Sequence, residues 1–231
     1  MTVTSRVAAA ATLLALAGCE RVPTGELGNG EFQYSCTGAP DSACGSGSSA
    51  QSIQLPAQVA VGASFSVTYS PTTFNDTTVE ESAGYTVVPA SPIMAQGSGG
   101  AIVAQRQGYV ALLARHNGTQ NVDDYVHVVL TPVAQLVPDA TQVTLSAGDT
   151  QTVTLRPLDA QGGDLAGQIG CTWSVTGNSG VVTLQAPSAG GSATLQGTGA
   201  GTTIVRASCG GASVDIDVTV IGSLSDGGTN G

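Results

Sequence analysis

The residues with the most obvious chemical potential lie in one stretch, RHNGTQNVDDYVH, from Arg115 to His127. If this stretch forms a hairpin, four oxygen-bearing side chains converge near its tip beside His116, namely Asn117, Asn121, Asp123 and Asp124. Such oxygens suit calcium, which takes about six to eight oxygen ligands. However, the regular acidic spacing of a dedicated calcium loop is absent, and Asn-Gly is itself a favoured turn dipeptide. We therefore predict a solvated hairpin and no metal site.

Acid–base and nucleophilic catalysis find little support in the rest of the chain. The sequence has two histidines, His116 and His127, so any serine or cysteine nucleophile would need one of them as its base. A Gly-x-Ser-x-Gly elbow is absent, and the GTGAGT run at 197–202 lies between two predicted strands, with no helix to receive a phosphate. We predict no catalytic residue, no cofactor and no enzymatic activity.

Four cysteines, Cys36, Cys44, Cys171 and Cys209, are spaced for disulfide chemistry. An even set in an exported chain favours disulfides over free thiols, and a Cys-x2-Cys metal knuckle is missing. Four cysteines allow three pairings. The long gap between the two groups favours Cys36 with Cys44 and Cys171 with Cys209.

The fifth cysteine, Cys19, follows a short processing signal. Residues 1–6 carry one positive charge, residues 7–17 are apolar, and this apolar run is shorter than the roughly 20 residues that a membrane span needs. Leu16-Ala17-Gly18-Cys19 resembles the lipobox of bacterial lipoproteins. The resemblance implies cleavage before Cys19 and attachment of acyl chains such as palmitate, so that the mature protein is anchored and does not span the membrane. An ordinary secretory signal, with Cys19 left as an incidental thiol, is the alternative.

Composition restricts the partners of the mature chain. Lysine is absent, and loss of Arg6 with the signal would leave five arginines against sixteen acids. An acidic chain repels phosphate backbones, which argues against nucleic acid, and it lacks the basic patches that bind anionic lipid. The acyl chains on Cys19 are therefore the only membrane attachment we expect. Because Glu20 follows the cysteine where inner-membrane lipoproteins often carry Asp, the outer membrane is favoured over the inner membrane in a Gram-negative host.

The elements that must position these residues are predicted to be β-strands throughout. Alternating apolar residues, punctuated by turns every 8 to 12 positions or so, are typical of sandwiches. Two segments repeat the same order of features, and we predict five parts of the chain. These are a signal peptide (1–18), a lipidated tether with a small disulfide loop (19–50), a first sandwich (51–134), a second sandwich (138–222) and a flexible tail (223–231).

The second segment resembles a group 2 bacterial immunoglobulin-like domain. The matching features are Gly148 before a Thr-rich strand, Trp173-Ser174 in a central strand, Val181-Val182, and the GTTIVRA strand from Gly201. The resemblance implies an all-β fold of two tandem immunoglobulin-like sandwiches, with Trp173 as a core anchor. Because Cys171 shares a strand with Trp173, a bond to Cys209 would tie neighbouring strands at one end of the sandwich, unlike the inter-sheet disulfide of antibody domains.

These observations predict a lipid-anchored, non-enzymatic protein of the bacterial cell envelope. Related domains occur in adhesins and cell-surface proteins, so the resemblance implies recognition of an unknown protein or glycan, or a spacer role. An accessory subunit of an export or polysaccharide-processing assembly is the alternative, and a metal-dependent hydrolase is a remote one.

Overall fold

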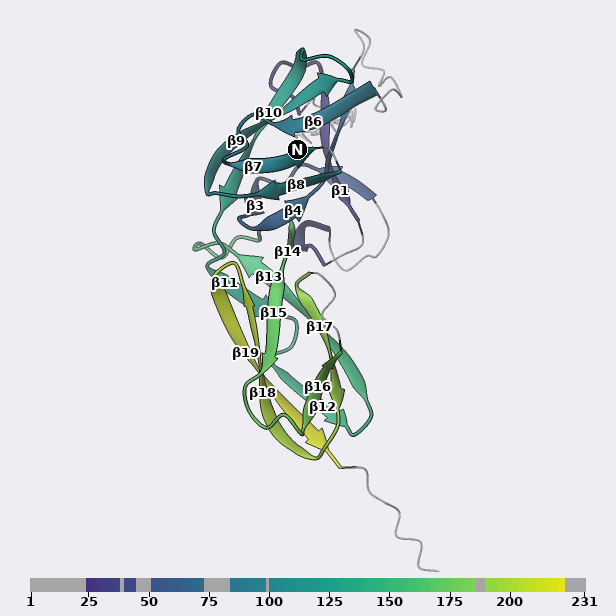
Figure 1. Cartoon of the computed structure of the whole chain (residues 1–231), viewed down its shortest axis with the longest axis vertical. Coiled ribbons are helices and arrows are strands. Elements are labelled where there is room, and N and C mark those ends of the chain that lie inside the picture. The colour runs from purple at the N-terminus through teal and green to yellow at the C-terminus, as the bar shows by residue number, and fades with distance from the viewer. Residues whose placement is uncertain are drawn as a thin grey trace, which may run out of the picture.

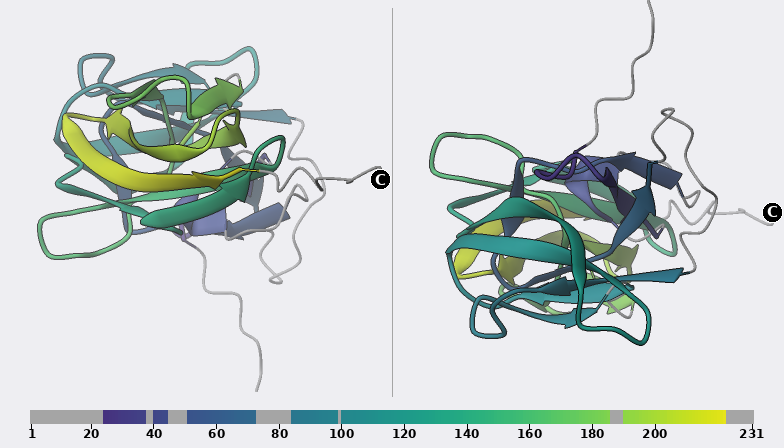
Figure 2. Two further views of the ribbon diagram at one scale, coloured as in Figure 1. Left: turned by 90° about the horizontal axis from the view of Figure 1, so that it is seen from below. Right: turned by 90° about the horizontal axis from the view of Figure 1, so that it is seen from above.

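The computed structural model describes residues 24–37, 40–44, 51–72, 84–98, 100–185 and 190–222. The predicted signal peptide, Cys19 and the predicted C-terminal tail lie outside these residues. The described chain forms two β-modules that are stacked end to end along the long axis of the molecule (Figure 1). Viewed along that axis from either end, the two modules overlap (Figure 2).

The first module contains ten strands. Three of them form the sheet β2-β1-β5, four form the sheet β3-β10-β9-β6, and β4-β8-β7 form most of a third sheet. Their bounds are β1 Gly30–Cys36, β2 Gln51–Gln54, β3 Gln58–Ala60, β4 Ala63–Phe65, β5 Val67–Pro71, β6 Tyr85–Pro89, β7 Ala95–Ser98, β8 Ala101–Ala104, β9 Gly108–His116 and β10 Val122–Thr131.

The second module packs the sheet β11-β13-β17-β16 against the sheet β12-β19-β18-β15. Its strands are β11 Gln135–Pro138, β12 Gln142–Ser146, β13 Thr150–Leu158, β14 Gln168–Ile169, β15 Cys171–Val175, β16 Val182–Gln185, β17 Ser192–Gly197, β18 Gly201–Cys209 and β19 Ala212–Ile221. On β19, Ile216, Val218 and Val220 are buried while Asp215 and Asp217 are exposed, as the alternation predicts. The predicted all-β class, with two β-sheet modules in series, is confirmed.

Strand β1 belongs to the first module and is not part of a tether. It pairs with β5 from Gly30↔Pro71 to Tyr34↔Val67 and with β2 on its other side. Phe32 and Tyr34 are fully buried in the core of the module. The first module therefore begins well before residue 51, where the sequence placed its boundary, because the short alternating run at 31–36 is a core strand.

The second module contributes a strand to the first. Residues 166–169 run between β3 and β4: Ala166 forms a parallel bridge with Val59, and β14 pairs with β4 through Gln168↔Ser64 and Ile169↔Ala63. This short segment thereby links the edge of β3-β10-β9-β6 to the edge of β4-β8-β7. The two modules consequently share hydrogen-bonded sheet and do not simply follow one another on a linker.

Two hydrophobic cores reflect this arrangement. The larger core fills the first module and continues across the junction to Leu165, Ile169 and Cys209, while a smaller core fills the second module. Trp173 packs against both cores. The predicted anchor of the second sandwich therefore also lies against the core that crosses the junction.

Helical structure in the described residues is limited to short 3-10 turns such as Ser42–Cys44 (η1). None of the helices in this part of the chain has the length and apolar character needed to cross a membrane.

Candidate functional site

The predicted hairpin at 115–127 forms between β9 and β10, but its carboxylates do not converge on a cation site. Asp124 is fully buried, and its carboxylate accepts hydrogen bonds from the backbone amides of Leu27 at 2.9 Å and Asn29 at 2.8 Å. Asp124 therefore anchors the N-terminal segment to β10. Among the described residues, no group of three or more His, Cys, Asp or Glu side chains is placed to hold a metal ion.

The two histidines have structural partners. The His127 ring Nδ1 lies 2.6 Å from Glu26 Oε1, and the His116 ring Nδ1 lies 3.2 Å from the carbonyl oxygen of Asn117. The His116 ring also packs edge-on against Tyr85, with 5.3 Å between ring centroids. Within the described chain, the contacts of the two imidazoles thus position neighbouring segments, and we find no serine or cysteine nucleophile activated by either ring.

Both predicted disulfides are present with the predicted pairing. Cys36 bonds to Cys44 over a separation of 8 residues, and Cys171 bonds to Cys209 over 38 residues. Cys171 and Cys209 occupy directly opposed positions on the neighbouring strands β15 and β18. The second bond therefore ties adjacent strands at the junction end of the module, as the position of Trp173 implied. Cys19, the predicted lipidation site, lies outside the described residues.

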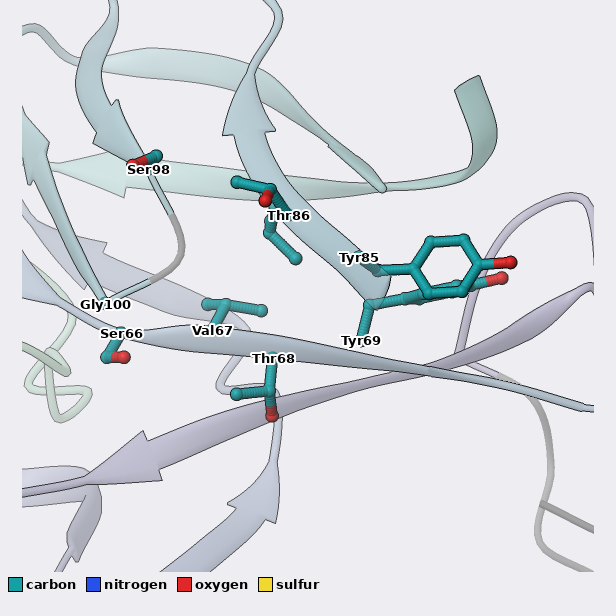
Figure 3. Close-up of a pocket in the computed structure, with 9 residues that line it drawn as sticks. Ser66, Val67, Thr68, Tyr69, Tyr85, Thr86, Ser98 and Gly100 are labelled. Atoms are coloured by element: carbon teal, nitrogen blue, oxygen red, sulfur yellow. The ribbon is translucent and has the colours of Figure 1, made fainter. Parts of the chain in front are cut away.

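A groove in the first module is a candidate for ligand contact (Figure 3). It has a volume of about 310 Å³ and lies between β5, β6 and the turn that joins β7 to β8. Its walls are Ser66, Val67, Thr68, Tyr69, Tyr85, Thr86, Val87, Ser98 and Gly100. The rings of Tyr69 and Tyr85 pack edge-on against each other at one end, 5.2 Å apart between centroids, with their hydroxyl groups directed away from Ser98 and Gly100.

The chemistry of this groove suits an uncharged group and not a reaction. None of the lining residues has a carboxylate or a basic side chain. Of the four aliphatic hydroxyl groups that these residues carry, that of Thr68 points away from Thr86 (Figure 3), and that of Thr86 donates to Asn117 Oδ1. Burial, followed by the nearby negative charge of Asp124, raises the pKa of Tyr69 above its usual range, so its phenol stays protonated. A volume near 310 Å³ is at the small end for ligand pockets, which are commonly about 300–1,000 Å³.

A buried polar cluster lies at the junction between the modules, centred on Asp41. This residue is only 8% exposed, and its carboxylate accepts hydrogen bonds from the Tyr34 hydroxyl and the Gly167 amide, which belong to different modules. Burial raises the pKa of Tyr34 well above its usual range, with Asp41 adding to the effect, so the phenol remains a donor. Asp41 lies within the predicted disulfide loop, but no local pattern indicates its role, because its partner Gly167 lies 126 positions away.

Comparison with known proteins gives distant structural likenesses alone. No protein-family model matches the sequence, and no curated protein matches it. Among solved structures, the chain is similar to domains 4 and 5 of the S-layer protein SbsC, with 15% identity, a TM-score of 0.35, and coverage of 66% of this chain and 90% of that one. It is also similar to the Yersinia pseudotuberculosis adhesin InvE, with 16% identity, a TM-score of 0.35, and coverage of 71% of this chain and 56% of the adhesin.

A further similar structure is invasin, a bacterial integrin-binding protein, at 22% identity with a TM-score of 0.27. The match covers 71% of this chain and 38% of invasin. These likenesses are distant, so the activity and partners of this protein have to be argued from its own residues.

Proposed function

We propose that this chain is a lipid-anchored, non-enzymatic protein of the bacterial envelope whose interlocked modules form a stiff spacer with a recognition surface. The observation that carries the spacer role is the strand at 166–169, which the second module inserts between β3 and β4 of the first. Modules joined only by a linker are expected to move relative to each other. A shared sheet with a continuous core opposes such motion.

The position of the N-terminal segment supports anchoring close to a membrane. Thr24 is already bound to β1, since its hydroxyl group accepts a hydrogen bond from the Phe32 amide at 2.6 Å. Only residues 20–23 separate Thr24 from Cys19, and five chain steps of about 3.5 Å span at most about 17 Å. Acyl chains on Cys19 would therefore hold the first module near the bilayer surface.

The direction in which the two modules follow the N-terminal segment also supports the proposal. Leu27 and Asn29 bind near the start of β10, whereas the other end of β10 pairs with β3 beside the junction. Strand β19 ends at the opposite pole of the second module (Figure 1). An anchor at Cys19 would accordingly project the second module away from the membrane.

Recognition is assigned to the groove between β5 and β6, which is lined by serine, threonine, tyrosine and valine residues, and to the exposed loops. Its uncharged lining favours a neutral partner such as a glycan or a peptide main chain.

Anchoring is tested in the native host by labelling with an alkyne analogue of palmitate, followed by membrane fractionation. The wild-type protein is expected to carry the label and to sediment with membranes, whereas Cys19→Ser loses the label and becomes soluble. Cys171→Ser/Cys209→Ser serves as the control, because it also replaces cysteine, leaves no unpaired thiol and should keep the label. A Cys19→Ser protein that remains acylated and membrane-bound would refute the proposal.

A further inference from the structure

The loop closed by the Cys36–Cys44 disulfide lies against the strand that the second module inserts into the first. Besides the bond between Asp41 and Gly167, the Ser42 hydroxyl donates to the Leu165 carbonyl, and the Gln168 side-chain amide donates to the Thr37 hydroxyl. These bonds reach the backbone or side chains of residues 165–168, which form or flank the inserted strand.

The Asp41 carboxylate links three segments. Oδ2 accepts the Tyr34 hydroxyl of β1, while Oδ1 accepts the Ala43 amide at 3.0 Å within the loop and the Gly167 amide at 3.1 Å across the junction. A buried carboxylate is tolerated only when its oxygens are paired. Docking of Gly167 therefore requires the loop to hold Asp41 in this position, and the disulfide fixes the loop at both ends.

Leu165 and Ile169 pack into the larger core, but the backbone ladder that holds the inserted strand in the sheet is short. Ala166 exchanges two hydrogen bonds with β3, from its amide to the Gln58 carbonyl at 3.1 Å and from the Ala60 amide to its carbonyl at 2.9 Å. Its pairing with β4 spans only Gln168 and Ile169. With so short a ladder, the contacts from the disulfide loop are a substantial part of the attachment.

We propose that the Cys36–Cys44 disulfide is a redox-dependent latch that sets whether the two modules form one rigid body. In the oxidised chain the loop presents Asp41, Ser42 and Thr37 to residues 165–168. In the dithiol form the loop is free to move, the Asp41 carboxylate regains water, and the inserted strand detaches from β3 and β4.

The latch closes by thiol–disulfide exchange with an envelope protein that carries a reactive disulfide. The Cys36 and Cys44 thiols together lose two electrons and two protons, their sulfurs become bonded, and the oxidant's disulfide is reduced to two thiols. Cys36 and Cys44 are 3% and 7% exposed in the docked structure, so oxidation precedes docking. This order rests on the export proposed above, whereas the mechanical role of the disulfide does not.

Amide hydrogen exchange on the mature chain, residues 19–231, tests the latch. Peptides covering 164–170 are expected to exchange at least about tenfold faster in Cys36→Ser/Cys44→Ser and in Asp41→Ala than in the wild type, while β18 and β19 remain protected. Asp41→Asn, which keeps an oxygen for the Gly167 amide, should show a smaller increase. Protection of β9 and β10 in the first module and of β19 in the second establishes that both modules of each variant have folded.

The matched control is Cys171→Ser/Cys209→Ser, which removes the other disulfide. It should loosen the ends of β15 and β18 but leave exchange at 164–167 unchanged. Unchanged exchange at 164–170 in Cys36→Ser/Cys44→Ser, or an equal increase at 164–167 in the control, would overturn the latch. Alkylation of free thiols in host cells is a separate readout: reduced Cys36 and Cys44 there would contradict export and leave the exchange result intact.

Discussion

At the scale of single residues, buried carboxylates organise this acidic protein by binding backbone amides. Asp124 and Asp41 hold segments distant in sequence, and Asp159 accepts the amides of Gln161 and Gly163 while bonding the Gln58 side chain of the first module at 3.1 Å. Each carboxylate compensates for its burial with several donors. The acids in these positions are thus structural parts of the fold.

Asp124→Ala is expected to lower the free energy of unfolding by about 1–3 kcal/mol, because the Leu27 and Asn29 amides lose their shared acceptor. The N-terminal segment should then become sensitive to protease, which limited proteolysis and thermal melting would measure. Asp123→Ala is the control, since Asn29 binds the backbone carbonyl of Asp123 and not its side chain. Equal loss of stability in the two variants would contradict the anchoring role of Asp124.

Asp159 should make stability depend on acid pH. Its backbone bond from Gly163 is the largest cause that holds the pKa of this carboxyl below its usual range. A depressed folded-state pKa gives stability that is present above the unfolded pKa of about 3.9 and is lost as pH falls through the folded value. Asp159→Asn should therefore melt lower than the wild type at pH 7, and this difference should shrink below about pH 4. Melting temperatures measured over a pH series test this, and a difference between wild type and Asp159→Asn that stays constant with pH would contradict it. Asp217→Asn is the control, because it makes the same substitution at an exposed position.

At the scale of elements, the long strands were predictable and the short ones were not. Strands β9, β10, β13, β18 and β19 have nine or ten residues each. The alternation of apolar and polar residues is therefore long enough to be told from a turn or a loop. Strands β3, β4 and β14 have three residues or fewer, so no period can be seen in them. The alternating run ASFSVTY at 63–69 reads as one strand but contains two, because β4 pairs with β8 and β14 whereas β5 pairs with β1.

The candidate sites show the same limit. The disulfides followed from cysteine spacing, and the hairpin at 115–127 followed from its turn dipeptide. The role of Asp124 in binding Leu27, and of Asp41 in binding Gly167, depends on contacts over 97 and 126 positions. Such pairs leave no local pattern in one sequence, and the groove between β5 and β6 likewise arises only when separate sheets meet.

Gly167 is the residue on which the inserted strand depends. Its φ is +104°, and a Cβ at this position would lie 2.6 Å from the Ala63 Cβ. Gly167→Ala should cost about 3 kcal/mol or more, combining backbone strain with a steric clash. Gly118→Ala, where φ is +79° and nothing lies within 4 Å, should cost only about 1–2 kcal/mol from strain alone. Denaturant unfolding compares the two, and similar costs would contradict close packing at Gly167.

At the scale of the whole molecule, shared sheet and shared core make the two modules one mechanical unit. The larger core crosses the junction through Leu165 and Ile169, and the hydrogen-bonded cluster around Asp41 also joins the two modules there. A spacer gains from this construction, because lateral force on the second module is carried by several hydrogen bonds and a packed interface. The sequence predicted two similar modules in series and gave no sign of the shared sheet.

Calorimetry should show that the two modules unfold together. The oxidised mature chain is expected to unfold in one transition, because separating the modules exposes the larger core and leaves β3 and β4 without their partner strand. Gly167→Ala should split this transition into two, since the second module keeps its own core when the inserted strand is lost. Gly118→Ala, which lies in the distant hairpin, should shift the single transition without splitting it. Two transitions in the wild-type protein would mean that the contacts at the junction are too weak to couple the modules.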